Sequence, residues 1–440
     1  MVKNNNSGQK LYKKAKKIIP GGNMFLSKRP EMFLPNQWPS YFSKARGCFV
    51  WDLDNRKYVD ASIMGIGTNS LGYGQKEIDA AVLKNIKKGN LSTLNCPEEV
   101  MLAEKLIEIN PWADMVRLAR TGGEANAIAI RIARAASGKQ NIAICGYHGW
   151  HDWYLSVNHN ETGNTLKDHL LPGLKPLGVP KNLQNTVFPF SYNDYEELEN
   201  LVNRNDIGII KMEVQRNYEP KNNFLKKVRN LANKKNIVLI FDECTSGFRE
   251  TFGGIFKKYN IEPDLSMFGK TLGNGYAITA VVGKKNIMEY AQKTFISSTF
   301  WSERIGPTAA LKTLEIMERE KSWEKITYLG SFLRNGWKNL AKRHNISIKL
   351  NGIPALSSFD FDHPNKYKFK TYLTQEFLKN GFLASNSFYA STAHSEKILS
   401  NYLSIYDKIL FDIKEFMDDK KSIDSMINGP IAHVGFKRLN

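Results

Sequence analysis

Residues 237–249 read IVLIFDECTSGFR and residues 263–270 read PDLSMFGK, and these two stretches decide the fold class. Each contains a short apolar run rich in branched and aromatic side chains, which predicts a buried strand. Asp242 stands at the exit of the first strand, and Lys270 follows the second strand, 28 residues after Asp242. Because open α/β sheets bind ligands beyond the carboxyl ends of their strands, we expect both side chains to face a ligand site.

Strands and helices alternate on either side of these two stretches. The apolar runs predict strands over residues 115–118, 141–145, 207–212, 237–241 and 265–268. The amphipathic segments between them predict helices over residues 76–88, 98–109, 124–136 and 195–202. This alternation is typical of an α/β fold in which helices cover both faces of a mainly parallel sheet.

The pattern differs at the two ends of the chain, which predicts three parts. Residues 1–66 form an N-terminal segment with a short helix and a β-hairpin between Phe42 and Asp60. Residues 67–312 form the large domain with the parallel sheet. Residues 313–440, where long helices flank short strands, form a smaller C-terminal domain of α+β type together with the N-terminal segment. The long stretch over 157–184 has no regular pattern, and we hypothesise that it is a lid.

The chain of 440 residues carries a formal net charge of +19, which raises the question of nucleic-acid binding. Its lysines are scattered at solvated helical spacings and form no basic arm with interleaved aromatic residues. We therefore interpret the charge as surface charge and expect no nucleic-acid partner. A basic nucleic-acid-binding protein stays the alternative from a different class, and steeply salt-dependent binding to mixed-sequence DNA or RNA would support it.

Cysteine spacing and the absence of long apolar runs bear on the location of the protein. The four cysteines lie far apart and form no CxxC pair, which argues against a zinc site or a disulfide framework: Cys48, Cys96, Cys145 and Cys244. The polar N-terminus has no signal-peptide pattern, and no apolar run is long enough to span a membrane. These features predict a cytoplasmic protein without a membrane partner.

Two further motifs follow predicted strands and could contact a ligand. Thr121-Gly122-Gly123 precedes an amphipathic helix, where free backbone N–H groups and the helix dipole favour a phosphate. An ordinary helix cap is the alternative. Tyr147 and His148 follow the strand over 141–145, where the tyrosine could stack on a flat cofactor. His148, His151 and Asp152 also raise the question of a metal, but their spacing fits no standard ligand pair, so we expect none.

Asp242 and Lys270 suit one kind of chemistry if they face the same ligand. A carboxylate can hold a protonated heterocyclic nitrogen by a charge-assisted hydrogen bond, which makes the ring an electron sink. A lysine amine can form an imine with a carbonyl group. A strand-end aspartate and a surface lysine without any such role are the alternative reading of this pair.

Taken together, these motifs resemble the class III pyridoxal-phosphate (PLP)-dependent aminotransferases, and within them the glutamate-1-semialdehyde 2,1-aminomutase branch. The resemblance runs from the AKKIIPGG of residues 15–22 to the STAH of residues 391–394. It is most specific from residue 241 to residue 270. It implies the PLP fold of type I, in which the large domain resembles that of aspartate aminotransferase and binds the cofactor.

The resemblance also implies roles for individual residues. Lys270 forms the Schiff base with PLP and carries the proton between the substrate and the cofactor. Asp242 pairs with the pyridinium nitrogen, and the glycines at 122 and 123 bind the phosphate. Thr299 reaches the phosphate of the neighbouring subunit, which implies a homodimer. Further cofactor contacts are implied for Tyr147, His148, Glu213 and Cys244.

Three departures from the aminomutase pattern lie on the substrate side. Residues 213–217 read EVQRN where the aminomutase has EPVAGN, residues 301–307 are longer than their counterpart, and residues 387–390 lack the family's glutamate. We therefore predict an aminotransferase for a small carbonyl acceptor, with a sugar or sugar-acid precursor as the candidate. An intramolecular aminomutase and a catalytically inactive PLP-binding subunit are the alternatives. Candidate substrate contacts are Arg29, Arg216, Asn217 and Arg304.

Overall fold

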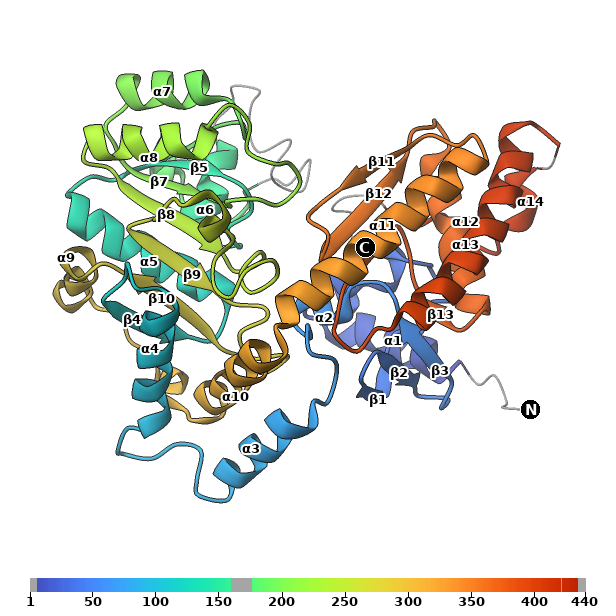
Figure 1. The fold of residues 1–440 in the computed structure, drawn as a ribbon, viewed down its shortest axis with the longest axis horizontal. Helices are drawn as coiled ribbons and strands as arrows, with labels where there is room; N and C mark the ends of the chain where they lie inside the picture. The colour runs from blue at the N-terminus through green and yellow to red at the C-terminus, as the bar shows by residue number, and fades with distance from the viewer. Residues whose placement is uncertain (1–5, 160–175, 421, 434–440) are drawn as a thin grey trace. The chain divides into compact units, whose positions relative to one another are not determined.

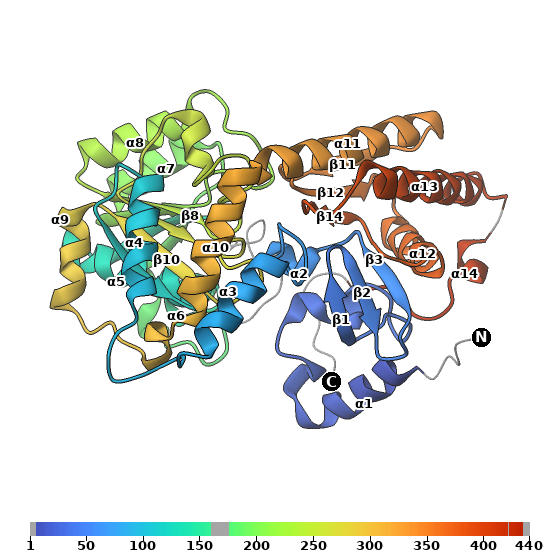
Figure 2. The same cartoon turned by 60° about the horizontal axis from the view of Figure 1, so that its bottom comes forward.

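The computed structural model describes residues 6–159, 176–420 and 422–433, which belong to two compact units. The large unit comprises Lys76–Trp323, and the small unit comprises Met1–Gln75 together with Glu324–Asn440 (Figures 1 and 2). The two ends of the chain therefore contribute to one unit. Most of the proposed lid over 157–184 lies outside the described residues.

A seven-stranded sheet in the order β4-β10-β9-β8-β7-β5-β6 forms the centre of the large unit. All of its pairs are parallel except those of β10, which runs antiparallel to β4 and β9. All five predicted strands are present, whereas β6 and β10 were not predicted. The strands are β4 (Met115–Ala119), β5 (Asn141–Cys145), β6 (Val187–Pro189), β7 (Ile207–Met212), β8 (Val238–Glu243), β9 (Leu265–Phe268) and β10 (Thr279–Gly283).

Both faces of the central strands are buried, because every residue of β7 and β8 is buried, whichever face of the sheet its side chain lies on. Helix α5 (Gly122–Ser137) covers one face and packs its Ile128 and Ile132 against Ile209, Ile240 and Met267 of the sheet. The other helices of this unit are α3 (Lys76–Ile86), α4 (Pro97–Ile109), α6 (Asp152–Leu155), α7 (Tyr195–Arg204), α8 (Phe224–Lys234), α9 (Lys285–Met288) and α10 (Ile305–Glu320).

The small unit contains two sheets and an aromatic core. One sheet has the order β1-β2-β3-β13, and β13 pairs with β3 in parallel, which ties the C-terminal segment to the N-terminal one. The predicted hairpin is present as β2 and β3, and β1 adds a third strand beside it. The first sheet consists of β1 (Phe42–Arg46), β2 (Phe49–Asp52), β3 (Lys57–Asp60) and β13 (Phe382–Leu383), and the second of β11 (Ile348–Asn351), β12 (Leu356–Phe361) and β14 (Ser387–Tyr389).

Long helices pack on the second sheet of the small unit. Trp337 of α11 (Ser322–Arg343) stacks edge-on against Phe359 of β12, with ring centroids 4.9 Å apart, and donates from Nε1 to the hydroxyl of Tyr402, 3.3 Å away. The remaining helices are α1 (Ser7–Ile18), α2 (Met64–Gly67), α12 (Lys366–Lys379), α13 (Glu396–Met417) and α14 (Ile423–Met426).

Candidate functional site

Most of the predicted site residues lie at the carboxyl end of the large unit's sheet. Asp242 is the last residue but one of β8, and Lys270 lies two residues beyond β9. Glu213 follows β7 directly, and Tyr147 and His148 follow β5. Parallel strands end at the same edge of a sheet, so side chains far apart in the sequence meet there.

Asp242 is buried and held on both oxygens. His148 Nδ1 lies 2.8 Å from Oδ2, and the backbone N–H of Cys244 donates to Oδ1 over 3.1 Å. Burial alone would raise the pKa of Asp242, but the ammonium of Lys211 and the hydrogen bond from His148 outweigh it and lower the pKa below its ordinary value. The carboxyl group is therefore ionised at neutral pH.

His148 is a neutral hydrogen-bond donor to this carboxylate. Its side chain is fully buried, and burial lowers its pKa. Because a carboxylate only accepts hydrogen bonds, the proton of the neutral imidazole is on Nδ1. The Nε2 atom is then an acceptor, and it is buried without a hydrogen-bond partner among the described residues.

Lys211 is a residue of this site that the sequence analysis missed. Its side chain is fully buried, and its Nζ lies 3.6 Å from Asp242 Oδ2 and 3.5 Å from Met267 Sδ. The sequence feature that could have identified Lys211 is a charged residue inside the otherwise apolar run of β7, because lysine is almost never fully buried unless it is paired.

Lys270 has the properties of a nucleophilic amine. Its Nζ donates to the hydroxyl of Thr245 over 2.5 Å, and the side chain is partly buried. Burial, reinforced by the nearby cation of Arg216, lowers the pKa of Lys270 to about 8. About a tenth of the amine is therefore unprotonated at pH 7, far more than in an ordinary lysine.

The glycines at the start of α5 lie in a close-packed turn. Thr121 caps the helix, since its hydroxyl accepts from the Glu124 N–H, and the Glu124 carboxylate accepts from the Thr121 N–H. The N–H groups of Gly122 and Gly123 have no partner within the helix. A Cβ on Gly123 would lie 2.7 Å from His151 Cε1, so a side chain there would crowd this edge of the site.

Glu213 contacts both the loop that follows β5 and the side chain of Arg216. It accepts from the Tyr147 N–H over 3.0 Å, and Arg216 Nη1 lies 3.3 Å from its Oε1. The chain turns at Gly146 with φ +110°, and a Cβ there would lie 2.6 Å from Glu213 Oε2, so only glycine fits. The ring of Tyr147 is 40% exposed, which leaves it open to stack on a flat ligand.

The other predicted residues have different surroundings. Arg304 forms an ion pair with Glu98, with its Nη2 3.0 Å from Oε1 and 3.1 Å from Oε2. Thr299 is exposed at the start of a short 3₁₀ helix, and Asn217 is exposed in the loop after β7. Arg29 belongs to the small unit. Cys244 adjoins the glycine before Lys270, where a Cβ on Gly269 would lie 3.2 Å from its Sγ.

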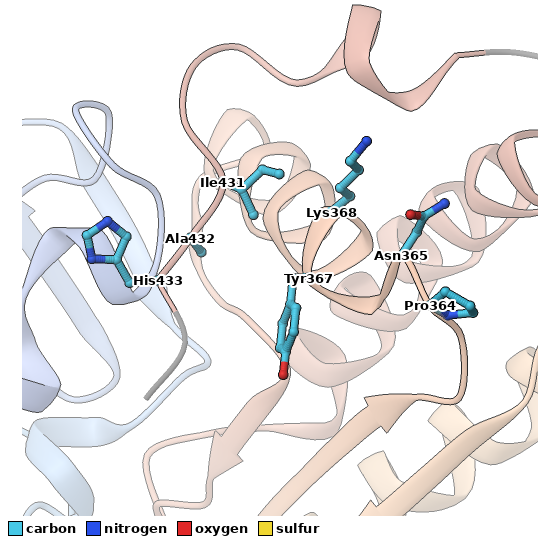
Figure 3. Close-up of a pocket in the computed structure, with 7 residues that line it drawn as sticks. All are labelled: Pro364, Asn365, Tyr367, Lys368, Ile431, Ala432 and His433. Carbon is cyan, nitrogen blue, oxygen red and sulfur yellow. The ribbon is translucent and has the colours of Figure 1, made fainter. Parts of the chain in front are cut away.

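Metal sites, membrane-spanning helices and surface pockets are the other features that bear on function. Across residues 6–159, 176–420 and 422–433, no cluster of three or more His, Cys, Asp or Glu side chains is arranged to hold a metal ion. In the same ranges no helix is long and apolar enough to cross a membrane. A surface pocket of about 450 Å³ in the small unit includes none of the predicted site residues (Figure 3) and is lined by Pro364, Asn365, Tyr367, Lys368, Ile431, Ala432 and His433.

Comparisons with known proteins agree on one family. Residues 35–391 match the family Aminotransferase class-III. The 3-aminobutyryl-CoA aminotransferase of Cloacimonas acidaminovorans is 35% identical over 92% of this chain and 97% of its own length. The glutamate-1-semialdehyde 2,1-aminomutase of Nitrosopumilus maritimus is 33% identical over 93% of this chain and 100% of its own. The PLP internal aldimine form of the FumI protein from a Sphingopyxis species is 25% identical, with a TM-score of 0.83 over 93% of this chain and 97% of that one.

Proposed function

The chain belongs to the class-III aminotransferase family and uses PLP, and we propose that it transfers an amino group between two separate small molecules. The observation that supports this best is the position of Arg216, whose guanidinium lies against Glu213 and close enough to Lys270 to lower its pKa. A solvent-accessible cation near the nucleophilic amine suits substrates with a carboxylate or another anionic group.

The residues of the large unit fit the cofactor. PLP has a phosphate, an aldehyde and a ring nitrogen that is protonated when it pairs with an acid. The N–H groups at the start of α5, the partly unprotonated amine of Lys270 and the ionised carboxylate of Asp242 match these groups in kind. The buried and unpartnered Nε2 of His148 adds an acceptor beside Asp242.

Each residue then has a distinct task. Gly122 and Gly123 would bind the phosphate with their backbone N–H groups, aided by the helix dipole. Asp242, oriented by His148, would hold the proton on the ring nitrogen. Lys270 would hold the cofactor covalently and, once released by the amino donor, move a proton at the substrate carbon that bears nitrogen. When bound, the cofactor supplies an electron sink for that carbon.

Amino transfer between two molecules and intramolecular transfer are distinguished by stoichiometry. The aminomutase among the relatives favours the second possibility, whereas Arg216, in a loop one residue shorter than the aminomutase pattern, favours the first. The experiment incubates the PLP-loaded enzyme with single amino donors and a panel of carbonyl acceptors, including sugar-derived ones. Release of one keto acid per donor consumed supports the proposal, and isomerisation of a single substrate without a donor would overturn it.

The relatives and the surface suggest an acceptor class and an assembly. One relative is named for a coenzyme A thioester of an amino acid, so acyl-CoA compounds belong in the panel beside sugar-acid precursors.

The exposed Thr299 lies between Phe295 and Phe300, which are 84% and 69% exposed, and this supports a homodimer in which Thr299 reaches the neighbouring site. The four free cysteines support a cytoplasmic location.

Arg216→Ala and Arg304→Ala are expected to separate substrate binding from stability. Loss of Arg216 should raise the KM for the anionic substrate about 10-fold to 100-fold, because one charge-assisted contact is lost. Loss of Arg304 should lower the free energy of unfolding by about 3 kcal/mol, because it strands the carboxylate of Glu98, and should leave KM unchanged. Steady-state kinetics and urea unfolding of both variants measure this, and equal KM changes would contradict the assignment.

The attachment of PLP to the cofactor-free protein should depend on pH through Lys270. Only the unprotonated amine attacks an aldehyde, and the folded protein lowers the pKa of this amine to about 8. The attachment rate, followed by absorbance, should therefore rise with pH, reach half its maximum near pH 8 and level off above it. An ordinary lysine, with a pKa near ~10.4, would give a rate still rising at pH 10. In Arg216→Ala the midpoint should move upward, because a neighbouring cation is removed.

A further inference from the structure

Lys211 places a second basic group against the carboxylate that faces the cofactor site. It lies on β7 between β5 and β8, in register with Ile144 and Ile240. Side chains alternate along a strand, so Lys211 shares the sheet face of Ile209, the face that α5 covers. Its side chain is fully buried there, among the apolar residues of this core.

Among the residues that the structure describes, one acid lies close to Lys211 Nζ. Asp242 Oδ2 lies 3.6 Å away, and the other close polar contact is the thioether of Met267 at 3.5 Å. Burial lowers the pKa of the ammonium, and the charge of Asp242, with a smaller contribution from Glu213, opposes this shift. A buried ammonium is stable only with a counter-charge, and Asp242 supplies it.

The negative charge of Asp242 is balanced by only one of the groups that contact it in the described residues. His148 is neutral, and the Cys244 N–H is a dipole, so Lys211 supplies the positive charge beside this carboxylate in the cofactor-free protein. A protonated ring nitrogen brings a second cation to the same carboxylate. Two cations close together in a poorly solvated site repel each other.

We propose that Lys211 is a positioning residue for Asp242. In the cofactor-free protein the ammonium of Lys211 is the counter-cation of this carboxylate, and in the loaded protein it competes with the protonated ring nitrogen for the same carboxylate. This inference rests on the proposed role of Asp242. Lys211 keeps Asp242 ionised and correctly placed before the cofactor binds, and it weakens the hold of Asp242 on the ring once the cofactor is present. The chain thereby exchanges some cofactor affinity for an ordered cofactor-free site.

The test measures cofactor affinity without covalent attachment. Pyridoxamine phosphate has the same ring nitrogen and cannot bond covalently to Lys270, so its Kd for the cofactor-free protein at pH 8, from tryptophan fluorescence, reports the non-covalent contacts. Lys211→Met, which keeps the length of the side chain and removes the charge, should bind it about tenfold more tightly. Lys285→Met removes an exposed lysine of the same unit and should leave the Kd unchanged.

Two further results decide whether charge is the cause. Lys211→Arg keeps the cation and should keep a Kd within about twofold of the wild type. Cofactor-free Lys211→Met should melt at a lower temperature than the wild type, and saturating pyridoxamine phosphate should close most of that gap. An equal loss of melting temperature with and without ligand, together with an unchanged or weaker Kd, would show a packing role alone and overturn the proposal.

The outcomes also separate this inference from the proposed function. If the wild-type protein does not bind pyridoxamine phosphate, the proposed cofactor contacts fail, whatever Lys211 does. If the wild type binds it and Lys211→Met binds it equally well, only the inference about Lys211 fails. Should Lys211→Met not fold, Lys211→Gln, which is neutral and polar, takes its place with the same expected direction.

Discussion

Lys270→Ala is expected to lose amino transfer by at least about 10⁴-fold, because one amine serves both as the covalent anchor and as the group that moves a proton at the substrate carbon. The side chain lies just beyond β9, and its Nζ is held by Thr245. Lys211 also lies near this edge with a lowered pKa, but its amine is fully buried against Asp242, whereas the side chain of Lys270 is only partly buried. Keto-acid release at saturating donor measures the loss.

The covalent role is checked separately by trapping. After borohydride reduction, mass spectrometry should find one added cofactor on the peptide that contains Lys270 in the wild type and none in Lys270→Ala. Lys285→Ala, at an exposed position, is the matched control and should retain both the adduct and the activity. A reduced adduct on another lysine, or activity of Lys270→Ala within tenfold of the wild type, would show that the anchor lies elsewhere.

Asp242→Asn is expected to lower kcat by about 10²–10³-fold while the protein stays folded, because an amide keeps the shape but not the charge that holds a proton on the ring nitrogen. The cost falls on the chemical step, since the protonated ring stabilises negative charge that develops there. The measurement is kcat with saturating substrate and cofactor.

A cofactor analogue tests the cause of this loss. With PLP methylated at the ring nitrogen, the positive charge is permanent and needs no acid, so Asp242→Asn should recover a large part of its kcat. Glu243→Gln is the matched control on the same strand, because Glu243 is buried and accepts from Ser246 and the Phe256 N–H instead. A kcat loss in Glu243→Gln as large as that in Asp242→Asn, or no recovery with the analogue, would contradict the assignment.

Local sequence was sufficient to predict the strands and helices that depend on residues close together in the chain, such as an apolar run or a helix cap. The buried strands β7 and β9 were predicted with their observed bounds, since an uninterrupted apolar run is buried wherever the chain places it. The helix predicted over 124–136 is present as α5, which begins two residues earlier, at Gly122, directly after its cap Thr121; the cap acts locally, because it depends on residues three positions apart. The order of Asp242 and Lys270 after their strands then predicted which edge of the sheet holds the site.

The sequence did not decide which side chains meet across the sheet. Lys211 lies 31 residues before Asp242, and only the pairing of β7 with β8 brings their side chains together. Arg216 and Arg304 are equivalent candidates in the sequence, but one lies beside Glu213 and the other is paired with Glu98. Antiparallel β10 was also missed, because strand direction is set by pairing partners.

The amino-acid sequence by itself therefore determined the family, the cofactor and the elements that carry Lys270, Asp242 and the glycines, since these depend on local patterns and their order. Only the tertiary structure decided how the charges are partnered. Charges interact through space, over distances that depend on strand register and burial, and those quantities are set by contacts between residues distant in the chain.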